Sequence, residues 1–388
     1  MLQVVFWIAI AVVGYTFLGY GIVISLLVKL KGLIRKNDDK SVEDFIPNVT
    51  LVVPCYNEAD IIKEKIVNSL SLEYPNEKIE IVFITDGSND HFREVLGEFP
   101  SVKLLHEDRR AGKTAAENRA MKFVDSPFVV FTDANTMLNK KAIKNIVKHF
   151  SNDNVGCVSG EKRVLVEEED SASSAGEGMY WKYESFLKKM DSKFYSAVGA
   201  AGELVAFRTS LYRDLPEDTI LDDFMQSLLI ASDGYRIVYE PDAYAMETGS
   251  DSTSEELKRK VRISAGGWQS MKRLFFKITP FNHPLLFFQY LSHRVLRWTI
   301  TPFLLILIFL LNFFLLNEGF IYQLLMIGQV FFYAAAFVGY VLENRKLRIK
   351  VLFIPFYFCM MNYAVVAGLF RFLKGSQKST WEKSKRKS

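Results

Sequence analysis

The chain has 388 residues, of which 49% are hydrophobic and 24% are charged, and its formal net charge is +4. This length suits one large domain or two ordinary ones. The central part has no basic stripe interleaved with aromatic residues, so the composition argues against a nucleic-acid-binding protein. The three cysteines, Cys55, Cys157 and Cys359, are far apart and predict neither a disulfide framework nor a zinc site.

Four stretches without a charged residue lie near the two ends of the chain, at residues 2–27, 298–317, 319–342 and 351–370. Each is long enough for a helix to cross roughly 30 Å of hydrocarbon. The first stretch is too long for a cleaved signal peptide and has no basic start, so we expect a retained span.

Basic residues flank these stretches in three clusters. The clusters are Lys29, Lys31, Arg35 and Lys36; Arg345, Lys346, Arg348 and Lys350; and Lys378, Lys383, Lys385, Arg386 and Lys387. By the positive-inside rule, the first cluster places the central domain in the cytoplasm. If all three C-terminal stretches crossed the membrane, the last cluster would lie outside, against the same rule. One stretch can therefore be re-entrant or interfacial, and Pro355 makes the last one the first candidate.

Residues 284–298 carry His293, Arg294 and Arg297 among Leu, Phe and Tyr residues, which predicts an amphipathic helix in the membrane interface. A simple connector to the next span is the alternative. The expected organisation has five parts: an N-terminal transmembrane helix (1–30), a cytoplasmic domain (36–276), an amphipathic interfacial helix (280–298), two or three C-terminal spans (299–371) and a basic tail (372–388).

The central domain begins with alternating strand and helix patterns. Apolar, strand-like runs lie at 49–54, 79–84, 102–105 and 128–131, and helical spacing is found at 58–72 and 113–123. Strands that alternate with helices predict right-handed crossovers and a doubly wound parallel sheet.

Three acidic segments follow apolar runs in this domain: Asp86, Asp133 and the pair Asp222 and Asp223. Carboxylates at the carboxyl ends of buried strands lie where open α/β sheets bind ligands. Each one alone could be an ordinary turn former. Together, in a stretch flanked by membrane-length segments, they predict one site for a charged, metal-bound substrate beside a bilayer.

Motifs that contain or adjoin these acids follow one another in a fixed order along the chain. They are Pro54-Cys-Tyr-Asn-Glu58, Thr85-Asp86-Gly-Ser-Asn-Asp90, Arg109-Arg-Ala-Gly-Lys113, Phe131-Thr-Asp133-Ala-Asn135, and Gly199-Ala-Ala-Gly-Glu203 ahead of Leu221-Asp-Asp223-Phe. The ordered set resembles the membrane-associated family-2 glycosyltransferases, which include bacterial polysaccharide and glycolipid synthases. It covers roughly residues 49 to 275. The resemblance implies an α/β domain of the Rossmann-like GT-A fold, the nucleotide-diphospho-sugar transferase fold, with flanking transmembrane helices, and inverting chemistry.

The resemblance also implies a set of donor-binding residues: Pro54, Tyr56, Glu58, Asp86, Lys113, Asp133, Arg259 and Arg262. Asp86 would bind the base and ribose, and Asp133 with Asn135 would hold Mg²⁺ or Mn²⁺ across the diphosphate. The family pattern is Asp-x-Asp, and Asn135 supplies an oxygen without a charge. Lys113 would neutralise phosphate, although a plain helix start is an equal alternative.

Asp223 matches the family's catalytic base, and Asp222 replaces the Glu of its Glu-Asp pair. Because adjacent carboxylates repel, we expect one of the two to have a raised pKa. An acidic first turn of a helix is the alternative for this pair. The expected acceptor residues are Gly199, Gly202, Glu203 and Trp268.

The stretch that reads Gln-x-x-Arg-Trp in polymerising members departs from that pattern here. Arg259 stands in place of Gln and Ile263 in place of Trp, while Arg262 keeps the phosphate role. This departure weakens the case for a processive polymer synthase. The alternative for the whole stretch is a basic helix that faces solvent or lipid and binds no phosphate.

The expected function is the transfer of a sugar from a nucleotide sugar, in the first place a UDP-sugar, to a lipid-linked or growing glycan acceptor. The transfer is expected at the cytoplasmic face of the cell membrane, where membrane lipids surround the apolar helices. A processive synthase that extrudes its product is one alternative. A nucleotide-sensing scaffold or transporter without catalysis is another. A dinucleotide-dependent dehydrogenase is excluded because no Gly-x-Gly-x-x-Gly follows the first strand. The sugar, the acceptor and the oligomeric state are left open.

Overall fold

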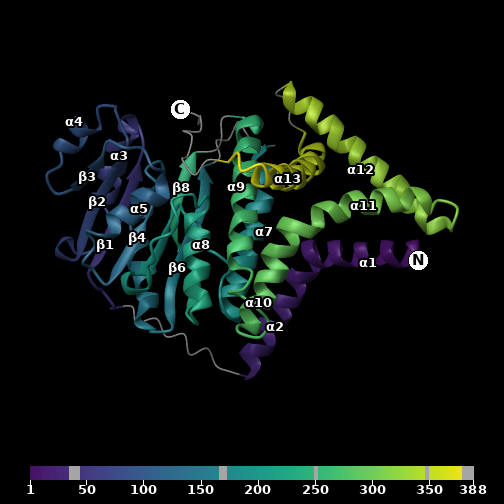
Figure 1. Cartoon of the computed structure of the whole chain (residues 1–388), viewed down its shortest axis with the longest axis horizontal. Helices are drawn as coiled ribbons and strands as arrows, with labels where there is room; N and C mark the ends of the chain where they lie inside the picture. Colours follow the sequence, from purple (N-terminus) through teal and green to yellow (C-terminus); the bar gives the residue numbers. More distant parts are fainter. Residues whose placement is uncertain (35–43, 166–172, 249–251, 346–348, 378–388) are drawn as a thin grey trace.

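The structure, a computed structural model, describes residues 1–34, 44–165, 173–248, 252–345 and 349–377. Within these ranges a mixed α/β domain lies on one side, and long apolar helices project from the other (Figure 1). Several residues of the sequence predictions lie outside the described ones: Arg35 and Lys36 with the predicted domain boundary, Lys346, Arg348, and the basic tail from residue 378.

The domain is built on a mixed sheet whose described strands follow the order β3-β2-β1-β4-β7-β6-β8-β5. Their bounds are β1 Val49–Cys55, β2 Ile79–Asp86, β3 Lys103–Glu107, β4 Phe128–Phe131, β5 Met137–Leu138, β6 Val155–Leu165, β7 Val205–Arg208 and β8 Arg236–Thr248. Strands β1 to β4 pair in parallel, and β7 runs antiparallel to both β4 and β6.

The four strands expected from the sequence correspond to β1–β4, and the expected α/β fold is confirmed. The second half of the sheet was not predicted. Strand β7 has only four residues, and β8 carries a register shift against β6 near Gly160, so neither shows a long regular pattern. Their partners are distant in sequence, which local periodicity does not report.

Helices cover both faces of the sheet. They are α3 Ala59–Leu70, α4 Phe92–Gly97, α5 Lys113–Met121, α6 Ala142–Val147, α7 Ser173–Phe194, α8 Asp222–Ser232 and α9 Thr253–Leu274. Leu51 and Val53 of β1 join the core beneath α3 and α6, whereas Val52 joins the core beneath α5, α8 and α9. Because both faces are covered, the central strands are apolar throughout rather than alternating.

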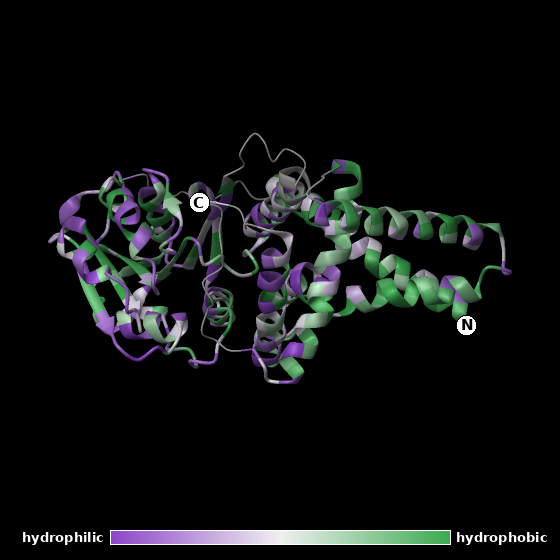
Figure 2. Ribbon diagram, turned by 90° about the horizontal axis from the view of Figure 1, so that it is seen from above, coloured by the Kyte–Doolittle hydropathy of each residue, from purple (hydrophilic) through white to green (hydrophobic). Residues whose placement is uncertain are grey.

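Four described helices are long and apolar enough to cross a membrane: Leu2–Ile34, Pro284–Phe314, Phe320–Asn344 and Lys350–Leu373. They comprise α1 Leu2–Gly14 with α2 Tyr20–Ile34, α10 Pro284–Tyr290 with α11 Thr301–Phe314, α12 Phe320–Asn344, and α13 Lys350–Leu373. Figure 2 shows hydrophobic residues concentrated on the projecting helices, away from the more polar domain.

The segment predicted as an amphipathic interfacial helix is continuous with the helix that follows it, and its charged side chains are buried against α7. Glu184 of α7 lies 2.6 Å from Arg294, 3.1 Å from Arg297 and 3.4 Å from His293. His293 also bonds Asp191 at 2.5 Å. Although burial alone would raise the pKa of the Glu184 carboxyl, its interactions with Arg294, His293 and Arg297 hold it well below its usual range. The polar face of this segment thus joins the apolar helices to the domain.

We expect Glu184→Gln to lower stability strongly, because it leaves the buried Arg294 and Arg297 without a compensating carboxylate. Breaking a buried ion pair costs about 3–5 kcal/mol. The matched control is Glu98→Gln, because Glu98 pairs with Lys63 at the surface with its side chain 57% exposed, and exposed pairs contribute about 0–1 kcal/mol. The measurement is thermal unfolding in detergent, and equal losses of Tm in the two variants would contradict the prediction.

Candidate functional site

The loops after β1 and β2 meet at one edge of the sheet, because parallel strands end on the same side. The N–H of Asn57 donates to Ser88 Oγ at 3.1 Å, and the N–H of Ala59 donates to Asp90 Oδ2 at 2.8 Å. Asn57 has φ 52°, in the left-handed region that Asn tolerates better than most residues. The first two motifs of the sequence are therefore bound to each other.

Asp86, the last residue of β2, is buried and fixes the start of α5. Its Oδ2 accepts the N–H groups of Ala111 at 3.0 Å and Gly112 at 2.6 Å. Arg119, further along α5, donates to its Oδ1 at 3.2 Å. The carboxylate thus holds the Arg109–Lys113 motif against the sheet edge.

The Arg110 guanidinium covers the ring of Tyr56 at 3.8 Å from the ring centroid, which joins the first motif to the third. Gly87 lies against this loop with φ +69°, and a Cβ there would stand 2.6 Å from Cβ of Arg110. Only glycine fits this conformation and this close approach. The Asp-Gly pair is therefore required by the local packing.

Lys113, the first residue of α5, lies among acidic side chains. Its Nζ is 2.8 Å from Asp133, 3.7 Å from Asp222 and 3.8 Å from Glu117. Although burial lowers the pKa of Lys113, the charges of these carboxylates hold it well above its usual value. A Cβ on Gly202 would lie 3.1 Å from Nζ and 3.2 Å from Asp223 Oδ2, so the donor, base and acceptor motifs meet here.

Asp222 and Asp223 form the first turn of α8, and the structure supports the expected repulsion between them. Burial, together with the charge of Asp222, raises the pKa of Asp223 to about 7. A carboxylate with such a pKa can accept a proton near neutral pH.

Glu117 belongs to this cluster and was not predicted. It lies one helical turn after Lys113 on α5, is 5% exposed, and hydrogen-bonds Asp222. Burial and the charge of Asp222 raise the pKa of Glu117 well above its usual value. The i, i+4 spacing from Lys113 was the only sequence signal that could have indicated it.

Lys65 of α3 was also missed. It is fully buried, and its Nζ donates to Thr136 O at 2.6 Å and to Thr132 Oγ1 at 3.0 Å. These bonds fix both ends of the loop that carries Asp133 and Asn135. Burial lowers the pKa of Lys65 to about 7. A lysine inside an amphipathic helix is normally a surface residue, so its sequence gave no signal.

The two arginines expected on α9 have different surroundings. Arg259 forms a bidentate pair with Glu256, at 2.9 and 3.0 Å. Burial lowers the pKa of Arg262, and the charges of Asp222, Asp133 and Asp223 oppose that shift, which places its guanidinium near the acidic cluster. Of the two, Arg262 is the one whose charge faces the site.

Among the remaining predicted donor residues, Pro54 is buried within β1 and Glu58 precedes α3. The charge of Glu58 acts on the pKa of Lys65, where it opposes the lowering caused by burial.

The expected acceptor residues divide into two groups. Glu203 adjoins the cluster but is paired with the buried Lys162 at 2.6 Å, which holds the pKa of Glu203 below its usual range despite burial. Trp181 lies beside this pair, with Lys162 Nζ at 5.3 Å and Lys260 Nζ at 5.1 Å from its ring. Trp268 instead packs against the core beneath α8 and α9. Sugar stacking by Trp268 stays a prediction.

The donor set suits a divalent ion completed by a substrate. The described residues contain no group of three or more His, Cys, Asp or Glu side chains that could hold a metal ion. Asp133 and Asn135 offer two oxygen ligands on one loop. Magnesium-type sites commonly use one or two carboxylates together with phosphate oxygens of the substrate. The residues therefore fit an ion that arrives with a diphosphate.

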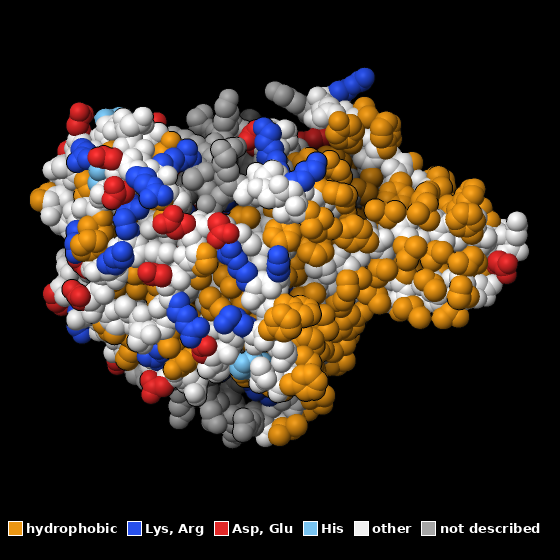
Figure 3. Space-filling model, viewed as in Figure 1, with side chains coloured by type: hydrophobic (Ala, Val, Ile, Leu, Met, Phe, Trp, Pro, Cys, Tyr) orange, Lys and Arg blue, Asp and Glu red, His pale blue; other side chains and the backbone are white. Residues whose placement is uncertain are grey.

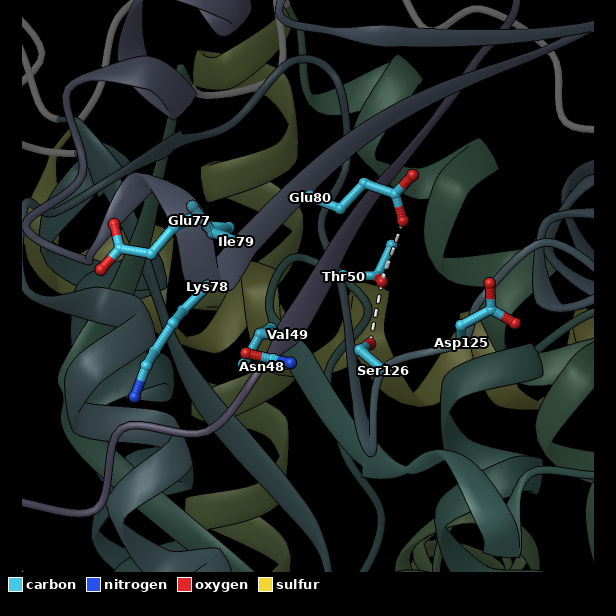
Figure 4. A pocket seen from close by; sticks show the side chains of 9 residues that line it. All are labelled: Asn48, Val49, Thr50, Glu77, Lys78, Ile79, Glu80, Asp125 and Ser126. Carbon is cyan, nitrogen blue, oxygen red and sulfur yellow. Dashed lines mark hydrogen bonds between the residues drawn. The ribbon is translucent and has the colours of Figure 1, made fainter.

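A second concavity lies at the opposite, amino-terminal edge of strands β1 and β2 (Figure 4). There Thr50 bonds Ser126 at 2.8 Å, and the walls include Glu77, Glu80 and Asp125. None of the predicted site residues lines it, so it is separate from the acidic cluster.

Comparisons with known proteins agree with this geometry. Residues 50–215 match the family described as Glycosyl transferase family 2. The chain is 30% identical over 256 residues to the poly-beta-1,6-N-acetyl-D-glucosamine synthase of Staphylococcus aureus strain MSSA476, over 63% of this chain and 60% of the relative. It is 26% identical over 266 residues to the enzyme of the same name from Staphylococcus epidermidis, over 66% and 63% of the two chains. The chain thus spans less than two thirds of the length of these relatives.

A solved structure matches over almost the whole chain. It is the mannosyltransferase PcManGT from Pyrobaculum calidifontis in complex with GDP-Man and Mn²⁺. The TM-score is 0.73 at 23% identity, and the match covers 96% of this chain and 99% of the other. At this identity the likeness concerns the fold.

We expect Gly199→Ala to destabilise the site, because Gly199 has φ +82° and a Cβ there would stand 2.2 Å from the ring of Phe224. The strained backbone and the overlap together should cost about 2 kcal/mol or more. Gly97→Ala is the control, since a Cβ there meets nothing within 4 Å. Thermal unfolding measures both, and a Tm of Gly199→Ala equal to that of the control would overturn this account of the turn.

Proposed function

We propose that this chain, whose residues 50–215 match Glycosyl transferase family 2 and whose fold is of the GT-A type, transfers a sugar from a nucleotide diphosphate to a glycan or lipid-linked acceptor with inversion. The meeting of Asp133, Asp222 and Asp223 around Lys113 carries this proposal. Lys113 supplies a positive charge, and the loop of Asp133 supplies oxygen ligands for a metal ion. Asp223, whose pKa is raised, lies beside them in the first turn of α8.

The proposed donor is a UDP-sugar. Tyr56, Asp86 and Arg110 line the sheet edge where a nucleoside would lie, and Lys113 and Arg262 supply positive charge for a diphosphate. The likeness to synthases of an N-acetyl-D-glucosamine polymer supports a hexosyl or N-acetylhexosaminyl group. The GDP-Man bound by the structural neighbour makes a guanosine donor the natural comparison.

The proposed cofactor is Mg²⁺ or Mn²⁺, held by Asp133 and Asn135 with the donor diphosphate. Such an ion would neutralise the charge that develops on the leaving diphosphate. Lys113 bonds Asp133 at 2.8 Å in the structure and can turn its ammonium group to the same phosphates. Lys65 fixes the loop beneath them.

The proposed base is Asp223, which would take the proton from the acceptor hydroxyl as that oxygen attacks the anomeric carbon. Burial and the charge of Asp222 raise the pKa of Asp223, and Asp222 is itself hydrogen-bonded to Glu117. A lipid-linked acceptor at the cytoplasmic face fits the apolar helices and the basic residues Lys29 and Lys31 that follow the first one.

We expect Asp223→Asn to reduce product formation by about 10²–10⁴-fold, the usual contribution of a positioned base, while UDP binding by calorimetry is unchanged. Asp233→Asn is the control, because Asp233 caps the other end of α8 and pairs with Arg213. Products are measured by mass spectrometry with UDP-hexose, UDP-N-acetylhexosamine and GDP-Man. Undiminished transfer by Asp223→Asn would remove the base assignment, and nucleotide binding without transfer by the native chain would favour the sensing scaffold.

The pH dependence of kcat/KM should follow the same carboxylate. Because the base acts only when it is deprotonated and its pKa is raised to about 7, the rate should rise with pH through about 7 and then level off. Asp222→Asn removes the adjacent like charge, so the rise should move to lower pH. A rise that stays in place, or moves to higher pH, would contradict this cause.

The metal proposal is tested at the residue that departs from the family pattern. Asn135→Asp should tighten Mn²⁺ binding in the presence of UDP, because it adds a carboxylate, and Asp133→Asn should weaken it. Chelation by EDTA should stop transfer by the native chain. Calorimetric titration of Mn²⁺ provides the measurement, with the exposed Asn154→Asp as the control. Equal affinities in all four proteins would place the ion elsewhere.

A further inference from the structure

Helix α13 runs alongside α9 at the edge of the domain. Near its start, Phe353 and Tyr357 pack on Leu257 of α9. Farther on, Gly368 touches Ser264, where a Cβ would come within 2.5 Å of Ser264 Cβ. Near its end, the ring of Phe372 lies 6.0 Å from Nζ of Lys272. These contacts run in one order along both helices, so the two helices lie side by side.

The other apolar helices behave differently. Helices α1, α11 and α12 project together away from the domain, whereas α13 stays at their base beside α9 (Figure 1). At the far end of the projection, Gln3 bonds Glu318 at 3.0 Å and Trp7 bonds Tyr322 at 3.2 Å. Figure 3 shows a nearly continuous apolar surface over the projecting helices.

Both ends of α13 are held at the domain. Its start follows the end of α12, where Glu343 accepts a hydrogen bond from Thr253 in the first turn of α9. Its end lies beside Lys272, in a turn of α9 that is fixed to the domain through the ion pair of Arg273 with Asp218 at 2.7 Å. A helix of this length that crossed a bilayer would place its ends about 30 Å apart along the membrane normal.

The free face of α13 suits a lipid surface. It exposes Val351, Tyr363, Phe370 and Leu373 to 57–75% of their area, and exposed basic residues lie near both ends. These are Lys350, Arg371 and Lys374. Apolar side chains between basic ends are typical of helices that lie at the boundary between headgroups and acyl chains.

We infer that α13 does not cross the bilayer but lies in its surface layer on the domain side, with its exposed apolar face among the lipids and its basic ends at anionic headgroups. The chain then crosses three times, through α1–α2, α10–α11 and α12. With three crossings, the described basic residues after α2, before α13 and at the end of α13 are all on one side, as the positive-inside rule requires; they are Lys29, Lys31, Arg345, Lys350, Arg371 and Lys374. With four crossings, Arg371 and Lys374 would lie opposite the domain.

Single-cysteine labelling tests the side of the membrane on which α13 ends. In a Cys359→Ala background, where the remaining Cys55 and Cys157 are buried, Ser376→Cys is treated with a membrane-impermeant maleimide in vesicles of known orientation. Glu77→Cys reports the domain side and Glu318→Cys the far side. We expect Ser376→Cys to react whenever Glu77→Cys reacts; reaction together with Glu318→Cys would overturn the inference.

Spin labels test the contact with lipid. Val351→Cys and Tyr363→Cys, each in the Cys359→Ala background, carry a nitroxide whose depth is measured by the relative effects of oxygen and a water-soluble nickel complex. A surface helix places both labels at similar, shallow depths in vesicles containing phosphatidylglycerol. A spanning helix separates them by roughly 18 Å over twelve residues. That separation, or two labels in water, would also overturn the inference.

Discussion

The site depends on one electrostatic constraint, the placement of several carboxyl groups around the ammonium group of Lys113. Asp133, Asp222 and Glu117 all lie within 4 Å of it, and Asp223 adjoins it across Gly202. Burial of neighbouring carboxyl groups disfavours their charged forms, and Lys113 and Arg262 compensate this only in part. Burial, together with the charge of Asp222, therefore raises the pKa of both Glu117 and Asp223, which suits Asp223 to the proposed role of base.

The loops around the cluster are fixed by hydrogen bonds of their own. Asp86 is fully engaged by Ala111, Gly112 and Arg119, so its charge organises the start of α5 instead of adding to the cluster. Lys65 fixes the Asp133 loop from below. A substrate that carries phosphates and a divalent ion would therefore meet carboxylates that are already held in place. The negative charge of these carboxylates would attract the metal ion.

The sequence indicated the parts of this arrangement whose signals are local. Strands β1 to β4 and the acids at their ends follow from apolar runs and turns. Residues 50–215 match the family predicted from the order of motifs, and the predicted fold is confirmed. Glu117 and Lys65 were missed because each looks like an ordinary polar residue of an amphipathic helix. Their roles arise from partners far along the chain, such as Asp222 and Thr132, which no periodicity reports. For the same reason the charges of residues 284–298 looked interfacial, although the structure buries them against Glu184 and Asp191 of α7.

Helix α9 joins the acidic cluster to the apolar helices. On one side Gly266 allows Leu221, next to Asp222, to approach, since a Cβ there would stand 2.6 Å from Leu221 Cγ. On the other side Ala265 and Ser264 meet Gly368 of α13. Small residues on both sides thus bring α8, α9 and α13 into close layers, so the proposed base on α8 and the helix that we assign to the lipid surface are separated by one helix. An acceptor anchored in that surface would have to reach only past α9, which carries Arg262 toward the acidic cluster where we propose that the diphosphate binds.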